Sequence, residues 1–90
     1  MRFLKKKSKV PSMRRQEILN RLKKALSQEF KISERAVKPQ ARFKEDLNID
    51  SLGYIWALIA IEEEFCIEIP EDVAEKFLTI ENVVEYLYAR

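Results

Sequence analysis

Apolar residues recur at intervals of three and four along three segments of this sequence, which is the spacing of an α-helix with one buried face. These segments end near Phe30, Phe65 and Leu87. The chain has a single glycine, Gly53, and no internal repeat. We therefore predict an all-α fold, a small bundle of three main helices plus one short helix.

The first and last helices have clear start signals. Ser12 is a suitable N-cap for a helix that continues to Phe30, and Thr79 can cap the last helix. β-branched and aromatic residues in the last segment would also suit a strand, but their 3–4 spacing favours a helix. The predicted apolar faces are Ile18, Leu19, Leu22, Ala25, Leu26 and Phe30 in the first helix, and Ile80, Val83, Val84 and Leu87 in the last.

Two further segments complete the predicted bundle. Residues 31–49 break the helical pattern and contain Pro39, so they form a long loop, and loops of this length inside a small domain are often functional. Pro70, Glu71 and Asp72 open a short helix, because proline suits a first helical position and acidic residues suit the positive end of a helix.

The length of 90 residues suggests one domain with one modest core. We expect residues 1–12 to be a flexible basic tail and residues 13–90 to be the helical domain. Residues 1–44 carry 15 basic and 3 acidic side chains, whereas residues 45–90 carry 2 basic and 12 acidic ones. This division indicates an interaction surface on each half.

The compartment can be predicted from what the sequence lacks. No apolar run is long enough to span a bilayer, so we expect no stable membrane insertion. The single cysteine, Cys66, fits a reducing compartment. We expect a cytoplasmic monomer, with an organelle matrix as the other location, since the basic tail also resembles a targeting segment.

The second predicted helix, residues 51–65, begins directly after Asp50 and Ser51, which are both good capping residues. The simplest interpretation of Ser51 is therefore a helix cap. At 100° per residue, Tyr54, Leu58, Ile61 and Phe65 fall within about 40° of one line and should face the core.

The opposite side of this helix is also apolar. Trp56 lies about 180° from Phe65, with Leu52 and Ile59 nearby. A helix in a domain of this size is rarely buried all round, so we interpret this side as a partner-binding face. The residues assigned to it are Leu52, Ile55, Trp56, Ile59, Glu62 and Glu63. Gly53 precedes Trp56 by about one turn, and we expect its missing side chain to admit a partner backbone or an attached arm.

The stretch FKEDLNIDSLGYIWALIAIEEEFCIEIPEDVAEKF, followed by TIENVVEYL, resembles the acyl carrier protein family. Members typically show F-x-x-D-L-G-x-D-S-L, an apolar helix ending in an E-E-E-F-like sequence, and then I-P before a short helix. The resemblance covers residues 13–89. D-S-L alone is a weak signal, but the combination of these elements at matching spacing is highly specific.

The resemblance implies that Ser51 is the attachment site of 4′-phosphopantetheine and that Asp50 assists the modification by helping a phosphopantetheinyl transferase hold its metal. It also implies a carrier of acyl groups, not an enzyme, with acyl-transferring and acyl-processing enzymes as partners. Aspartate before the serine points to an acyl carrier and not a peptidyl carrier.

Three departures from the family pattern suggest a specialised member. Asn48 replaces the usual glycine, although asparagine also tolerates a positive φ. Gly53 and Trp56 replace acidic or polar residues of many members, and the basic first half is atypical of an acidic family.

The other class of function is an unmodified helical adaptor that binds a protein partner through the Trp56 face. Several chemistries are disfavoured. The absence of histidine excludes a Ser–His triad, and one cysteine cannot form a zinc site. Asp46, Asn48 and Asp50 imitate the start of a calcium loop, but the later positions do not match. We expect neither a metal site nor nucleic-acid binding, since no binding motif accompanies the lysines.

Overall fold

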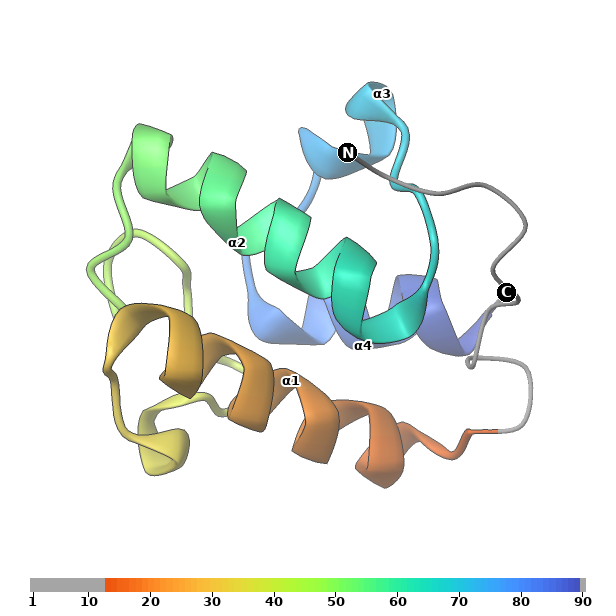
Figure 1. Cartoon of the computed structure of the whole chain (residues 1–90), viewed down its shortest axis with the longest axis horizontal. Coiled ribbons are helices and arrows are strands. Elements are labelled where there is room, and N and C mark those ends of the chain that lie inside the picture. Colours follow the sequence, from red (N-terminus) through yellow and green to blue (C-terminus); the bar gives the residue numbers. More distant parts are fainter. Residues whose placement is uncertain (1–12, 90) are drawn as a thin grey trace.

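Helix α1 (Arg15–Phe30) packs against both α2 (Ser51–Phe65) and α4 (Ile80–Tyr88) (Figure 1). The structure is a computed structural model that describes residues 13–89. A short 3-10 turn, η2 (Glu34–Ala36), lies in the loop after α1, and a four-residue helix, α3 (Glu71–Ala74), lies between α2 and α4. This order confirms the predicted all-α bundle with a long loop before its second main helix.

The predicted helix starts need two corrections. Helix α1 begins at Arg15 with Arg14 as its N-cap, and the Glu17 carboxylate accepts a hydrogen bond from the Arg14 N–H. Ser12, like the rest of the expected tail at residues 1–12, lies outside the described residues. Pro70 occupies the N-cap position of α3, so Glu71 is its first residue. In contrast, Thr79 caps α4 as predicted, since its hydroxyl accepts the Asn82 N–H.

The core is built from one face of each main helix. Large side chains with no exposed surface come from all three helices and are Ile18, Leu22, Leu26, Ile61, Phe65, Ile80, Val83 and Leu87. Ala25 and Phe30 of the predicted α1 face are only partly buried. The loop between α1 and α2 fills the remaining side of the core with Val37, Phe43, Leu47 and Ile49. The long loop is therefore part of the fold and not an appendage.

Backbone hydrogen bonds join this loop to the junction between α3 and α4. The Phe43 N–H donates to the Leu78 carbonyl at 3.1 Å, and the Ile80 N–H donates to the Ala41 carbonyl at 3.0 Å. Between them, Arg42 and Thr79 form an isolated antiparallel bridge. These bonds hold in place the chain that leads into α2, because the loop cannot move without breaking them.

A local ion pair stabilises the same loop. Arg42 Nε lies 3.0 Å from Asp46 Oδ2, and the Arg42 backbone N–H donates to the same oxygen at 2.8 Å. The side-chain hydrogen bond from Arg42 lowers the pKa of Asp46 below its usual value. Asp46 is thus engaged in shaping the loop.

No helix in the described part of the chain is long and apolar enough to cross a lipid bilayer.

Candidate functional site

Asp50, and not Ser51, is the N-cap of α2. The Asp50 carboxylate accepts the Gly53 N–H at 2.8 Å, and its carbonyl accepts the Tyr54 N–H at 2.8 Å. Ser51 is the first residue of the helix and is exposed to solvent. Its hydroxyl has no hydrogen-bond partner within residues 13–89. The interpretation of Ser51 as a helix cap is therefore wrong, and its hydroxyl is left available for chemistry.

The turn before Asp50 needs a left-handed residue, and Asn48 supplies it. Asn48 has φ of 60°, whereas Leu47 and Ile49 on either side are buried. Asparagine adopts this conformation more readily than most non-glycine residues. The expectation that Asn48 can stand in for glycine is confirmed. The turn anchors two apolar side chains in the core and leaves Asp50 and Ser51 at the surface.

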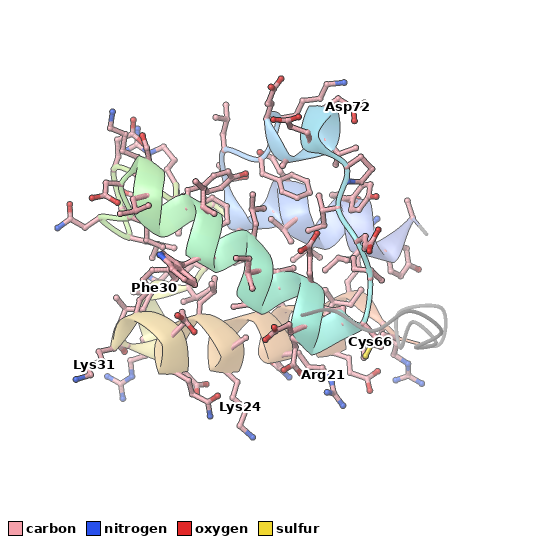
Figure 2. The ribbon with its side chains drawn as sticks, turned by 45° about the horizontal axis from the view of Figure 1, so that its top comes forward. Arg21, Lys24, Phe30, Lys31, Cys66 and Asp72 are labelled. Carbon is pink, nitrogen blue, oxygen red and sulfur yellow. The ribbon has the colours of Figure 1, made fainter. Side chains whose placement is uncertain are left out.

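Gly53 lies close to other parts of the chain on the side where a side chain would project. A Cβ atom at this position would lie 3.2 Å from Ile49 Cγ2 and 3.5 Å from Phe30 Cε1. Figure 2 shows Phe30, at the end of α1, lying against the first turns of α2. The missing side chain of Gly53 therefore suits packing within the chain, and the expectation that it also admits a partner or an arm stays a prediction.

Tyr54 connects α2 to α3 one turn after Ser51. Its hydroxyl donates to the Ala74 carbonyl at 2.5 Å, and its ring meets the Phe43 ring edge-on at 5.4 Å between centroids. Burial raises the pKa of Tyr54 to about 12. The sequence placed Tyr54 in the core stripe, but it and Leu58 are only partly buried, and Ala57 joins Ile61 and Phe65 in the buried face. Helical spacing gave no signal for the Tyr54 hydrogen bond.

The opposite face of α2 is exposed, as predicted. Leu52 is 67% exposed, Ile55 54% and Trp56 53%. Ile59 continues the same face and is partly buried, and Glu63 lies exposed beyond it. We refer to Leu52, Ile55, Trp56, Ile59 and Glu63 as the Trp56 face.

Glu62, which the sequence also assigned to the partner-binding face, has a contact within the chain. Its carboxylate accepts the Ile69 N–H at 2.7 Å, so it fixes the chain that follows α2. This chain reverses direction at Cys66, which has φ of 57°. No sequence signal pointed to this contact, because Ile69 lies beyond the end of the helix.

The comparisons with known proteins agree with this geometry. A family model described as "Phosphopantetheine attachment site" matches residues 20–87. The "Acyl carrier protein" of Thermosynechococcus vestitus is 39% identical over 75 residues, which cover 83% of this chain and 93% of the relative. The "Acyl carrier protein" of Helicobacter hepaticus is 43% identical over 68 residues, which cover 76% and 90%. The chain therefore belongs to the acyl carrier protein family.

Proposed function

We propose that this protein holds acyl intermediates as thioesters on a 4′-phosphopantetheine arm attached to Ser51. It would deliver them to enzymes of fatty-acid, lipid or polyketide-type synthesis. The observation that carries the proposal is the exposed Ser51 hydroxyl at the first position of α2, inside the stretch that the family model matches. The loop segment that leads to Ser51, residues 43–50, is held in place by the hydrogen bonds described above.

The residues around Ser51 fit an attached phosphodiester. The backbone N–H groups of Ser51 and Leu52 start the helix and have no hydrogen-bond partner within residues 13–89. Free N–H groups and the helix dipole favour an anion at such an end, by roughly 0.3–1 kcal/mol at an exposed site. The bound group would supply a flexible thiol that carries the cargo, while the protein fixes its point of attachment.

Asp50 has two roles in this proposal. Its carboxylate caps α2 through the Gly53 N–H, which positions Ser51. Its negative charge beside a phosphodiester is unfavourable, so its further value lies in the modifying reaction, where it assists the metal of a phosphopantetheinyl transferase. The chain has no histidine to act as a base near Ser51. We infer that the transferase performs the chemistry and that this protein is a carrier and not an enzyme.

The Trp56 face is the proposed contact surface for acyl-processing enzymes. Tryptophan buries a large rigid area and is over-represented among binding hot spots. An apolar face of this kind suggests recognition that rests less on charge than in most of the family. We place the protein in the cytoplasm as a monomer, or else in an organelle matrix.

Intact mass tests the attachment. Coexpression with a phosphopantetheinyl transferase should add about 340 Da, the mass of the attached group. Ser51→Ala should abolish the addition, whereas Ser33→Ala, at another exposed serine that caps η2, should retain it. Modification of the Ser51→Ala variant would refute the assignment.

A second candidate function is an unmodified adaptor, which the exposed Trp56 face favours. In that case the mass would not change after coexpression, and partner binding would need no attached group. The same mass measurement therefore separates the two functions.

A further inference from the structure

A groove of about 430 Å³ runs between α1 and α2 on the side of α2 that carries Trp56. We refer to it as the α1–α2 groove. Ala25, Gln28 and Glu29 of α1 form one side, and Trp56, Ile59 and Glu63 of α2 line the other. The groove thus includes part of the Trp56 face but extends onto α1, which the proposed function does not use.

The groove combines apolar and acidic surface. Trp56 and Ile59 offer exposed apolar area, while the carboxylates of Glu29 and Glu63 have no ion-pair partner among the described residues. In contrast, the neighbouring Glu64 is paired with Arg21 at 2.9 Å. A segment that fits this groove should carry both lysine or arginine and large apolar side chains, because unpaired carboxylates attract cations and apolar surface favours burial.

The chain itself contains such a segment. Residues 1–12 read MRFLKKKSKVPS, with four lysines, an apolar pair at Phe3 and Leu4, and no acidic residue. This segment joins the fold at Met13, which is buried just before α1 begins.

Residues 1–12 join the fold close to the end of the groove that carries Glu63. The Arg21–Glu64 pair and the contact of Phe30 with Gly53 show that α1 and α2 run antiparallel, so the start of α1 lies beside the end of α2 (Figures 1 and 2). Arg21 is six residues after Arg15, which is about 9 Å along the helix. Glu63 is therefore close to the place where residues 1–12 enter the fold.

The segment is also long enough to reach Trp56. An extended chain covers about 3.3–3.6 Å per residue, so Lys9 can lie up to about 14 Å from Met13, and Phe3 up to about 36 Å. Trp56 is seven residues before Glu63, which is about 10 Å along α2. The lysines can therefore reach Glu63, and Phe3 and Leu4 are far enough along the chain to reach Trp56 and Ile59.

We propose that residues 1–12 dock in the α1–α2 groove, with their lysines beside Glu63 and with Phe3 and Leu4 against Trp56 and Ile59. Because Trp56 and Ile59 also belong to the Trp56 face, the docked segment competes with partner enzymes for that surface. Salt releases the segment, since exposed ion pairs are screened. This docking does not depend on modification of Ser51, so the mass test and the test below fail independently.

Trp56 is the single tryptophan of the chain and reports directly on the groove. The test compares the intact chain with a variant in which Lys5, Lys6, Lys7 and Lys9 are all replaced by glutamate. At low salt, Trp56 fluorescence of the variant should shift to longer wavelength and be quenched more strongly by acrylamide. Raising salt from about 0.01 M to about 1 M, which shortens the Debye length from about 30 Å to about 3 Å, should bring the intact chain to the emission of the variant.

Matched controls separate docking from net charge. Replacing Arg35, Lys38, Lys44 and Lys76 by glutamate makes the same charge change at exposed positions that do not line the groove, and it should leave Trp56 emission unchanged. Glu63→Lys alone should release the segment, and combining it with the four lysine-to-glutamate changes should restore the original emission. Phe3→Ser with Leu4→Ser should also shift the emission, with the lysines intact.

Equal emission and equal quenching of the intact chain and the four-lysine variant at low salt would overturn the proposal. A shift that depends on protein concentration would overturn it as well, because it would assign the groove to the segment of a second copy. Circular dichroism of every variant confirms that the helices are retained before the emission is compared.

Discussion

The Tyr54 hydroxyl donates a 2.5 Å hydrogen bond to the Ala74 carbonyl, and this bond attaches α3 to α2 one turn after the proposed modification site. Helix α3 has only four residues, which is too short to be stable alone. The bond therefore helps to fix both the position of α3 and the surface next to Ser51.

Tyr54→Phe should lower the free energy of unfolding at neutral pH by about 1 kcal/mol, the typical net value of one hydrogen bond. The raised pKa of about 12 favours the neutral phenol in the fold. The stabilisation of the fold by the neutral phenol is complete below the ordinary tyrosine pKa of about 10, and it is lost as the pH rises through about 12. Urea unfolding between pH 9 and 12 should show a steeper loss of stability in the unmodified chain than in Tyr54→Phe. Tyr88→Phe, at an exposed tyrosine, is the control and should follow the unmodified chain.

Asp50→Ala should destabilise the protein by about 0.5–2 kcal/mol, because it removes the cap of α2. Ser51→Ala should change stability by less than about 0.5 kcal/mol, since the serine hydroxyl bonds no described residue. Thermal unfolding of the two unmodified variants measures both effects. A larger loss for Ser51→Ala than for Asp50→Ala would contradict the assignment of the cap.

Glu62→Ala and Glu63→Ala should change the free energy of unfolding by different amounts, although the two residues are adjacent. Glu62→Ala removes the acceptor of the Ile69 N–H and should cost about 1 kcal/mol. Glu63→Ala should stay within about 0.5 kcal/mol, because its side chain is exposed. Hydrogen exchange at the Ile69 amide gives a local measurement, and unchanged protection in Glu62→Ala would count against the contact.

The two sides of α2 should respond oppositely to truncation. Ile61→Ala and Phe65→Ala should each cost about 2–5 kcal/mol, since both side chains are fully buried. Trp56→Ala should cost little stability because Trp56 lies outside the core. Chemical denaturation tests this, and a collapse of stability in Trp56→Ala would show that Trp56 contributes to the core.

Partner recognition should depend more on Trp56 than on Glu63. Trp56→Ala should weaken acyl transfer to or from the holo protein more than Glu63→Gln does, because hot-spot aromatics contribute most of the binding energy. Rates measured across a salt series in the variant with the four tail lysines replaced by glutamate should change little, since competition by that segment is then absent. If high salt removed most of the affinity and Trp56→Ala had little effect on acyl transfer, recognition would instead be electrostatic.

Features that depend on helical spacing could be predicted from the sequence. The second helix was predicted over residues 51–65, and α2 has these bounds. The buried face of α4 and the exposure of Trp56 follow from the same periodicity. The backbone conformation of Asn48 could be predicted as well, because few residue types tolerate a positive φ.

Features that depend on individual contacts could not be predicted in this way. Asp50 and Ser51 both suit an N-cap, and only the backbone path decides between them. The contacts of Glu62 with Ile69 and of Gly53 with Phe30 were missed because those partners lie on other segments, whose positions periodicity does not give. The attachment of a group to Ser51 stays a prediction, since exposure and capping geometry show that the hydroxyl is available but not that it is used.

The hydrogen bonds between the loop and the start of α4 also set an order of events during synthesis. The loop receives its partners at Leu78 and Thr79 from a part of the chain that is translated after α2. Until those residues leave the ribosome, the backbone groups of Phe43 and Ala41 lack their final partners, and the approach to Ser51 is not fixed. If Ser51 is modified as proposed, polypeptides that end before Leu78 and Thr79 should therefore be poor substrates for the transferase.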